Sequence, residues 1–139
     1  MIKTLILIIF SFTNLMADNN MKNLTDLEKK VCLKQGTEAP FSGKYNKFYE
    51  KGKYLCKLCG IELFSSEHKY DSKSGWPSFF DLSTKENIKL VDDFSLGMKR
   101  VEVKCQCGSH LGHVFEDGPK PTGLRYCINS VCLEHKLLE

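Results

Sequence analysis

The chain has 139 residues, 42% hydrophobic and 27% charged, which is typical of one globular domain and excludes a disordered or fibrous protein. Its formal charge of +3 comes from 20 basic and 17 acidic residues. We therefore expect no binding of nucleic acid, which requires a concentrated basic face. Seven cysteines exceed what incidental packing explains, yet they are too few for a disulfide-dense miniprotein. Because seven is an odd number, they cannot all pair within one chain, and we expect them to have at least two roles.

The N-terminal segment has the three regions of a secretory signal peptide. Lys3 provides a basic start, Leu5 to Phe10 form an apolar run, and Ala17 is a small residue before a polar stretch. The apolar part covers about a dozen residues, too few to cross a bilayer as a helix. We predict a signal peptide at 1–17, a folded domain at 18–139 and export to the periplasm. The alternatives are an uncleaved N-terminal anchor, a buried N-terminal strand, and a cytoplasmic protein if the segment is not a signal.

One short helix is expected near the start of the folded domain. Thr25 and Glu28 form a capping-box pattern, in which each side chain accepts a hydrogen bond from a backbone N–H group of the first turn. Leu24, Leu27 and Val31 share one helical stripe, which Cys32 flanks. Gly36 then stops the helix, so we expect it to cover about residues 25–35.

The rest of the chain has the pattern of a β domain. Glycine and proline recur every ten or so residues, and the segments between them are short. Three segments with strand character cover residues 53–55, 100–103 and 124–129. Short alternating segments with regular turn signals predict a mostly antiparallel β domain.

Two cysteine pairs are candidates for a metal site. Cys56 and Cys59 are separated by two residues and followed by Gly60, the usual form of a zinc knuckle. Cys105 and Cys107 form the second pair, which is one residue shorter than usual. We predict that the four thiolates hold one structural Zn²⁺ per chain, while disulfides or inert buried thiols are the alternatives.

Cys127 has the surroundings of a reactive thiol. In an extended segment from Leu124 to Leu133, period-two alternation places Arg125, Cys127 and Asn129 on one face. A nearby guanidinium group stabilises a thiolate and lowers the pKa of the thiol, as a nucleophilic cysteine requires. Asn129 is able to hydrogen-bond a substrate oxygen or to orient the site. A buried structural thiol is the alternative.

His110 and His113 are candidates for acid–base chemistry, because imidazoles titrate near neutral pH. In a regular strand they would face opposite ways, but Gly112 permits a bulge that brings both to one site. The alternatives are structural histidines or further metal ligands. Trp76, the only tryptophan, lies in an aromatic run that provides either core or binding surface.

Set side by side, five motifs resemble those of the B-type peptide-methionine sulfoxide reductases. They lie at residues 36–43, 56–60, 74–79, 109–115 and 118–130. The resemblance covers roughly residues 24 to 135. The run Gly-Leu-Arg-Tyr-Cys-Ile-Asn-Ser at 123–130 is the most specific.

The resemblance implies a mainly β fold of two antiparallel sheets, with a short N-terminal helix and a structural zinc site. By the same resemblance, Cys127 attacks the sulfur of methionine-R-sulfoxide and becomes a sulfenic acid. His110, His113 and Asn129 would contact the sulfoxide oxygen and help to protonate it. Arg125 would support the thiolate, and Trp76 and Phe115 would hold the methyl group. The implied partners are oxidised proteins and a thioredoxin-like reductant, and we expect a monomer.

The resolving cysteine departs from the family pattern. Many family members place it just before the Gly-Trp-Pro run, where this chain has Ser74. Cys132 would lie roughly 16 Å from Cys127 on a straight strand, whereas a disulfide needs about 4.4–6.8 Å, so Cys132 serves only if the chain turns back sharply. The spacing does not forbid an approach of Cys32 to Cys127, and the resemblance implies that the resolving cysteine is able to lie in this N-terminal region, so we predict Cys32 as the resolving cysteine. Cys132 and direct reduction by an external thiol stay open.

Two other classes of function fit part of the pattern. A non-catalytic zinc-ribbon module would need the cysteine pairs alone, and a thiol peroxidase or disulfide oxidoreductase would need only Cys127. Neither needs an aromatic wall for a methyl group, so Trp76 and the paired histidines favour the reductase.

Overall fold

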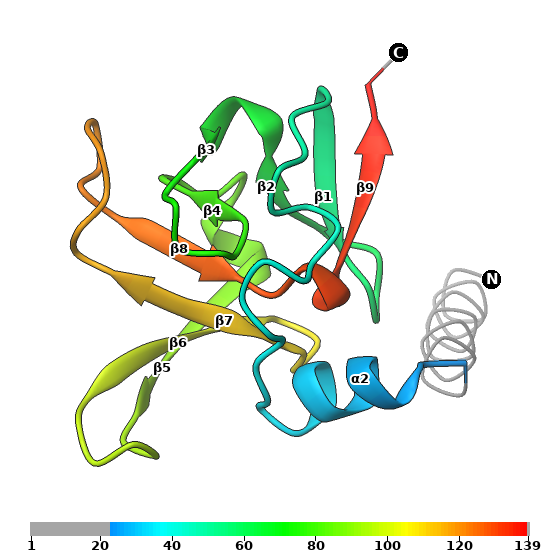
Figure 1. Cartoon of the computed structure of the whole chain (residues 1–139), viewed down its shortest axis with the longest axis vertical. Coiled ribbons are helices and arrows are strands. Elements are labelled where there is room, and N and C mark those ends of the chain that lie inside the picture. Colours follow the sequence, from blue (N-terminus) through cyan, green and yellow to red (C-terminus); the bar gives the residue numbers. More distant parts are fainter. Residues whose placement is uncertain (1–22, 139) are drawn as a thin grey trace, which may run out of the picture.

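The computed structural model describes residues 23–138, which form two antiparallel sheets (Figure 1). The smaller sheet has the order β2 (Glu62–Ser65), β1 (Gly52–Cys56) and β9 (Leu133–Leu137). The larger sheet has the order β3 (Lys69–Tyr70), β4 (Ser78–Phe79), β8 (Arg125–Ile128), β7 (His110–Phe115), β6 (Arg100–Cys105) and β5 (Ile88–Asp93). A mainly β fold of two antiparallel sheets is therefore confirmed, and the three segments predicted as strands fall on β1, β6 and β8.

Aromatic side chains from both sheets form the centre of the core. Phe79 of β4 stacks on Phe64 of β2 with ring centroids 4.5 Å apart, and it meets Tyr54 of β1 edge-on at 5.0 Å. All three side chains are buried. Offset and edge-to-face contacts of this kind add to the stabilisation from apolar burial. The two sheets are thus held together on the side opposite to the cavity described below.

The N-terminal helix begins as the sequence predicts. It consists of α2 (Asp26–Glu28), which continues as a π-helical turn, η1 (Lys29–Leu33). Both capping-box bonds form: Thr25 Oγ1 accepts from the Glu28 amide at 3.1 Å, and the Glu28 carboxylate accepts from the Thr25 amide at 3.2 Å. The predicted stripe is wrong at Leu27, whose side chain is 46% exposed, because the wider π-helical turn directs Val31 and Cys32 into the core.

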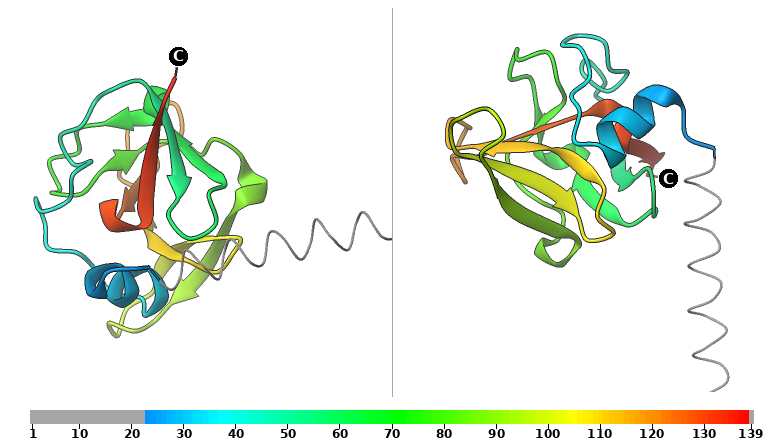
Figure 2. Two further views of the ribbon diagram at one scale, coloured as in Figure 1. Left: turned by 90° about the vertical axis from the view of Figure 1, so that its right-hand side faces the viewer. Right: turned by 90° about the horizontal axis from the view of Figure 1, so that it is seen from below.

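Three short 3₁₀ turns complete the fold: η2 (Ser66–His68), η3 (Lys85–Asn87) and η4 (Ser130–Cys132). The turn η4 carries the chain from β8 in the larger sheet to β9 in the smaller one, just after the segment that contains Cys127. Cys132, at the end of this turn, is bonded to Cys32 in η1, 100 residues earlier in the chain. The disulfide therefore fastens the N-terminal helix to the point where the chain changes sheets, and Figure 2 shows α2 beside this crossing.

None of the helices among residues 23–138 is long and apolar enough to span a membrane. The predicted signal peptide at 1–17 lies outside the described residues.

Candidate active site

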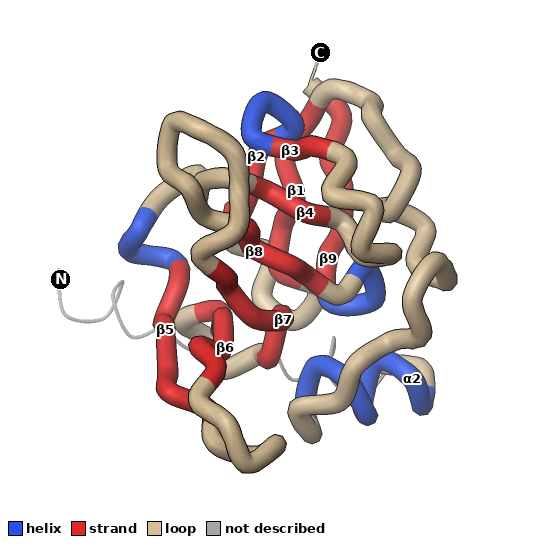
Figure 3. Tube along the Cα trace, turned by 60° about the vertical axis from the view of Figure 1, so that its left-hand side comes forward, coloured by secondary structure: helices blue, strands red, loops and turns tan. Residues whose placement is uncertain are grey.

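A row of directly opposed residues crosses five strands of the larger sheet. From the edge inward, Val91 of β5 pairs with Glu102 of β6, which pairs with His113 of β7. His113 in turn pairs with Cys127 of β8, which pairs with Ser78 of β4. Directly opposed residues point to the same face of a sheet, so the register alone brings an acid, an imidazole and a thiol together. Figure 3 shows these strands side by side.

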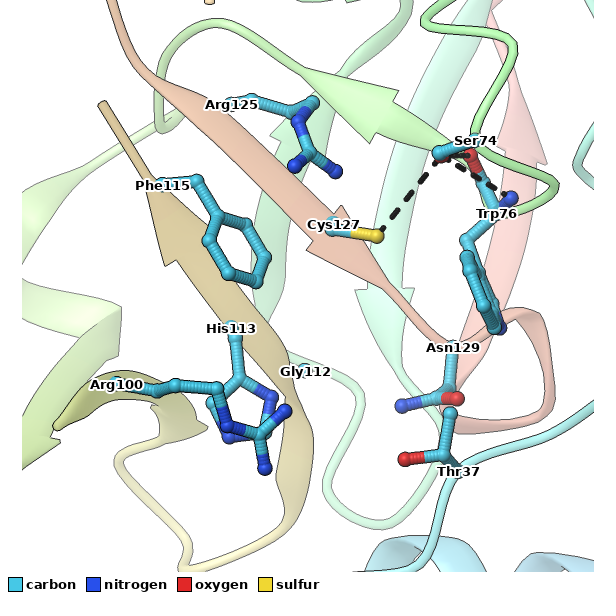
Figure 4. Close-up of a pocket in the computed structure, with 10 residues that line it drawn as sticks. All are labelled: Thr37, Ser74, Trp76, Arg100, Gly112, His113, Phe115, Arg125, Cys127 and Asn129. Atoms are coloured by element: carbon cyan, nitrogen blue, oxygen red, sulfur yellow. Dashed lines mark hydrogen bonds between the residues drawn. The ribbon is translucent and has the colours of Figure 1, made fainter. Parts of the chain in front are cut away.

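A cavity of about 330 Å³ opens on this face, and Cys127 lies within it (Figure 4). Its lining consists of Thr37, Ser74, Trp76, Arg100, Gly112, His113, Phe115, Arg125, Cys127 and Asn129. Six of these residues were predicted as site residues from the sequence, namely Trp76, His113, Phe115, Arg125, Cys127 and Asn129. The alternation predicted for the extended segment from Leu124 to Leu133 is confirmed in β8, where Arg125 and Cys127 are partly exposed while Tyr126 and Ile128 are buried. It is wrong beyond Asn129, because the 3₁₀ turn η4 interrupts the extended chain.

The Cys127 thiol is held between a hydroxyl group and a guanidinium group. Its Sγ lies 4.0 Å from Ser74 Oγ, and Arg125 lowers the pKa of the thiol through its charge. Burial acts in the opposite direction and is the larger effect, so the pKa of Cys127 is raised overall. Arg125 lowers the pKa of Cys127, as expected. The expectation of a low pKa for this thiol is wrong, because burial raises the pKa by more than Arg125 lowers it. Cys127 therefore rests as a thiol at neutral pH.

Arg125 is oriented by two other groups. Asp117 binds its guanidinium through both oxygens, at 2.8 and 3.0 Å, and this ion pair lowers the pKa of the Asp117 carboxyl. The guanidinium carbon also lies 4.5 Å from the centre of the Phe115 ring. A planar cation fixed on two sides keeps its charge beside the thiol.

A β-bulge brings the two histidines together, as Gly112 predicts. Val103 of β6 pairs with Gly112 while Lys104 pairs with His110, so Leu111 has no partner on β6. The extra residue turns both imidazoles to one side, with ring centroids 5.6 Å apart. Glycine is required here, because a Cβ at Gly112 would collide with the carbonyl oxygen of Cys127.

Each imidazole is held by a carboxylate. His110 Nδ1 donates to Glu102 Oε2 at 2.7 Å, and Gln35 Nε2 donates to the other oxygen of Glu102 at 2.9 Å. His110 and Glu102 are both buried, and burial lowers the pKa of His110 although Glu102 partly offsets this effect. His110 is therefore neutral near pH 7, and its Nε2 has no hydrogen-bond partner within 23–138. It does not line the cavity, unlike His113.

His113 makes the second such pair. Its Nε2 donates to Asp93 Oδ2 at 2.8 Å, and this hydrogen bond lowers the pKa of the Asp93 carboxyl. Arg100 approaches the same oxygen at 3.4 Å. Arg100 and His113 both line the cavity, and His113 is directly opposed to Cys127 on the neighbouring strand. The His113 imidazole therefore faces the thiol across the cavity.

Asn129 lines the cavity with Cys127, and both ends of its side-chain amide are already hydrogen-bonded. Its Oδ1 accepts from the Glu38 amide at 2.9 Å, and its Nδ2 donates to the carbonyl of Leu111 at 2.9 Å. The Asn129 backbone amide donates to that same carbonyl at 2.8 Å. Leu111 is the extra residue of the bulge, so Asn129 fixes the backbone between the two histidines.

Trp76 and Phe115, both predicted as binding residues, form aromatic walls of the cavity. Trp76 Nε1 donates to the carbonyl of Glu38 at 3.0 Å, which fixes the plane of the indole ring. Phe115 is held by the guanidinium of Arg125. An apolar wall beside a thiol suits a small apolar group such as a methyl thioether.

The four cysteines predicted as zinc ligands come together away from this cavity. The Sγ atoms of Cys56, Cys59, Cys105 and Cys107 all lie within 4.8 Å of one another. The Cys56–Cys107 and Cys59–Cys105 sulfurs are 3.7 and 3.5 Å apart. Four thiolates at about 2.3 Å from a tetrahedral Zn²⁺ would be separated by about 3.8 Å, so this donor set fits the ion.

The second cysteine pair has only one residue between its sulfurs, and its place at the end of β6 allows this shorter spacing. Cys105 is the last residue of β6, and Gly108 closes the turn by donating to the Cys105 carbonyl at 2.9 Å. Gly60 closes the first knuckle in the same way, donating to Cys56 at 2.8 Å. Both glycines have positive φ, 79° at Gly60 and 99° at Gly108, a conformation that other residues rarely adopt. One residue between the sulfurs is therefore sufficient here.

Cys32 has a partner different from the one the sequence analysis expected. It is bonded to Cys132, with the two Cα atoms 5.6 Å apart, and both residues are buried. The expectation assumed a straight strand from Cys127 to Cys132. In the structure η4 turns the chain after Asn129, and this turn directs Cys132 to the N-terminal helix. The resolving role of Cys32 stays a prediction, and it requires that this disulfide first be reduced.

Sequence reasoning missed the residues that support the site. These are Glu38, Asp93, Arg100, Glu102 and Asp117. Glu102 carries the clearest signal, since it is a charged residue flanked by two valines in a predicted strand. The others lie in turns or at strand ends, where the pattern does not show which side chains they meet.

Comparison with known proteins identifies the family. The model of the SelR domain matches residues 24–137. A peptide methionine sulfoxide reductase MsrB of Methanosarcina barkeri is 56% identical over 121 residues, covering 85% of this chain and 84% of that protein. Its counterpart of Teredinibacter turnerae is 51% identical over 127 residues, covering 86% and 94%.

A mouse protein named methionine-R-sulfoxide reductase B3, mitochondrial, is 55% identical over 113 residues, which are 81% of this chain and 45% of the mouse protein. The aligned part therefore spans less than half of that relative. The match of the family model extends from the capping box of the N-terminal helix to the last strand, and it includes every residue of the cavity and of the cysteine cluster. The chain belongs to the SelR-domain family of peptide methionine sulfoxide reductases.

Proposed function

We propose that this chain reduces the R epimer of methionine sulfoxide in oxidised proteins to methionine. The observation that carries the proposal is the position of Cys127. Of the seven cysteines, it alone is neither disulfide-bonded nor part of the four-cysteine cluster, and its thiol lies in an aromatic-walled cavity opposite an imidazole. Two of the relatives are named for reduction of methionine sulfoxide and one for its R epimer.

The first step is a transfer of oxygen. Cys127 attacks the sulfoxide sulfur as a thiolate, and the sulfoxide oxygen takes up a proton. The hydroxyl group then moves from the substrate sulfur to Cys127 Sγ: the sulfur–oxygen bond of the substrate and the transient sulfur–sulfur bond break, and a new bond from the oxygen to Sγ forms. Methionine leaves as the thioether and Cys127 becomes a sulfenic acid, so the substrate is reduced and the cysteine is oxidised. Arg125 favours the thiolate, while burial opposes it.

Protonation of the sulfoxide oxygen makes the substrate sulfur more electrophilic. His113 is the acid that lines the cavity, and Asp93 keeps its ring oriented. His110 and Glu102 hold the other side of the bulge, and Asn129 fixes the backbone between the histidines. We therefore assign Asn129 and His110 to positioning and His113 to contact with the oxygen. Trp76 and Phe115 enclose the methyl group.

Regeneration requires a thiol. A thioredoxin-like dithiol would reduce the sulfenic acid to the thiol with loss of water and become a disulfide itself. While Cys32 and Cys132 are bonded to each other, neither offers a thiol to Cys127. Direct reduction of Cys127 by the external dithiol is therefore the route that remains open while Cys32 and Cys132 are bonded to each other.

The cysteine cluster would hold one structural Zn²⁺ through Cys56, Cys59, Cys105 and Cys107. A bound ion would crosslink the end of β1 to the β6–β7 turn and thereby stabilise the fold. We further propose that residues 1–17 direct export, that 18–139 act as a monomer in the periplasm, and that its substrates are proteins oxidised there.

The test is an epimer-resolved assay. Residues 18–139 are incubated with mixed-epimer N-acetylmethionine sulfoxide amide and dithiothreitol, and the two epimers are separated by chromatography. The R epimer is expected to disappear while the S epimer persists, and Cys127→Ser is expected to consume neither. Persistence of the R epimer with the unsubstituted protein would refute the proposed function.

A further inference from the structure

The β5–β6 hairpin carries exposed apolar side chains beside the cavity. Phe94, Leu96 and Met98 in its turn are 65%, 67% and 63% exposed. Val91, on β5, is 37% exposed. We name these four residues the hairpin surface. In Figure 1 the hairpin projects at the lower left, away from the smaller sheet.

The hairpin surface is continuous with the cavity. Asp93 and Arg100, which pair with each other at the base of the turn, flank residues 94–99 on either side. Arg100 lines the cavity, and Asp93 accepts the hydrogen bond from His113. Val91 begins the row of opposed residues that leads through His113 to Cys127. The apolar turn thus starts where the polar wall of the cavity ends.

The edge position of β5 adds a second feature. Within residues 23–138, β5 pairs with β6 on one side and is the last strand of the larger sheet. An edge strand presents backbone N–H and C=O groups to an extended polypeptide, while its side chains provide pockets or apolar surface. A segment that places one residue in the cavity meets Arg100 in the cavity lining, and the apolar turn of residues 94–99 lies directly beyond Arg100.

We propose that the hairpin surface binds the apolar residues that flank methionine sulfoxide in an unfolded polypeptide substrate. The proposal rests on the proposed function and specifies its substrate class. Methionine is usually buried among apolar neighbours, and its oxidation disrupts the core that contains it. A segment exposed in this way carries the apolar residues that the hairpin surface would cover.

Kinetics with three substrates test this proposal. They are N-acetylmethionine sulfoxide amide, a peptide with leucine, valine and phenylalanine around the sulfoxide, and a matched peptide with serine and glycine. We expect the apolar peptide to have a kcat/KM about tenfold above that of the polar one, because apolar contacts made outside the cavity add binding energy. The double variant Phe94→Ser/Leu96→Ser should remove this advantage through KM while kcat is unchanged.

The matched control is Leu137→Ser/Leu138→Ser, which removes two leucines of β9 and its end that are 59% and 49% exposed. It should alter each kcat/KM by less than about twofold, since neither residue lines the cavity of Cys127. A single variant, Phe94→Ser, with an unchanged melting temperature guards against a double variant that fails to fold.

The outcomes separate the two proposals. If the unsubstituted protein does not reduce the small amide, the proposed function fails. If it reduces the amide but treats both peptides alike, or if the double variant keeps the preference, the hairpin surface is not a docking site. A concentration-dependent dimer that Phe94→Ser/Leu96→Ser abolishes would show that a second copy covers this surface, and it would overturn the proposal.

Discussion

Ser74 Oγ lies 4.0 Å from Cys127 Sγ, in the wall of the same cavity. This chain therefore places a hydroxyl group at the position where a second thiol could meet the oxidised Cys127. The hydroxyl lowers the pKa of Cys127 by hydrogen bonding, but it cannot form a disulfide.

Ser74→Cys should supply that missing thiol. After one turnover the new thiol should attack the Cys127 sulfenic acid, forming a disulfide and releasing water. Turnover supported by a thioredoxin-like dithiol should then rise several-fold, and mass spectrometry of the non-reduced protein should show the 74–127 disulfide. Ser72→Cys is the control, because Ser72 contacts Ser74 and Ser78 instead of Cys127. Equal turnover of the two variants would argue against a path through residue 74.

The Cys32–Cys132 disulfide should contribute mainly to stability. Closing a loop of 100 residues stabilises a folded chain by about 4.7 kcal/mol in the chain-entropy model. We expect Cys32→Ser/Cys132→Ser to lower the free energy of unfolding by roughly 3–5 kcal/mol, measured by urea denaturation. Single-turnover formation of methionine should be retained, because neither sulfur lines the cavity. Loss of thioredoxin-dependent cycling in Cys32→Ser, with normal stability, would instead support the resolving role predicted for Cys32.

The reactivity of Cys127 should rise with pH. Its pKa is raised by burial, and only the thiolate reacts, so the rate of alkylation by iodoacetamide should climb through a midpoint above that of an ordinary cysteine. Arg125→Gln removes the charge that lowers this pKa and should move the midpoint to still higher pH. Peptide mass spectrometry would measure the alkylation of Cys127 separately from that of the other cysteines.

Arg100→Gln provides the comparison for Arg125→Gln, because it removes a guanidinium group from the same cavity that is not among the main groups acting on the Cys127 pKa. Its midpoint should match that of the unsubstituted protein. A lower midpoint in Arg125→Gln would mean that the guanidinium group does not stabilise the thiolate.

Zinc should be bound by the four-cysteine cluster. We expect one ion per chain by elemental analysis and a melting temperature that falls by at least about 10 °C after removal of the ion, because a structural site contributes its binding energy to folding. Cys105→Ser should lose both the ion and this stability. Cys127→Ser, which leaves the cluster intact, should keep both. Much less than one ion per chain in the purified protein would reject the site.

Much of the fold and site follows from local sequence patterns. Strand alternation places Arg125 and Cys127 on one face, and a glycine between two histidines allows the bulge that joins them. The capping box of Thr25 and Glu28 marks the helix start. These features depend on neighbours within a few residues, which a single sequence displays directly.

The parts that were missed depend on register and on turns between sheets. Glu102 meets His110, and Asp93 meets His113, only because β5, β6 and β7 align with one bulge. The link between Cys32 and Cys132 depends on η4, which spacing along an extended strand does not reveal. Such pairs are set by tertiary packing, so residue spacing alone does not predict them.

The central claim is that Cys127 takes the oxygen of the sulfoxide and keeps it until an external thiol arrives. Its most direct test is a single-turnover reaction of residues 18–139 with the R epimer, without reductant and with dimedone to trap sulfenic acid. We predict one methionine per chain, one dimedone adduct on Cys127, and an unchanged Cys32–Cys132 disulfide in the non-reduced peptide map. Methionine formed together with a disulfide between Cys127 and another cysteine, or no methionine at all, would contradict this account.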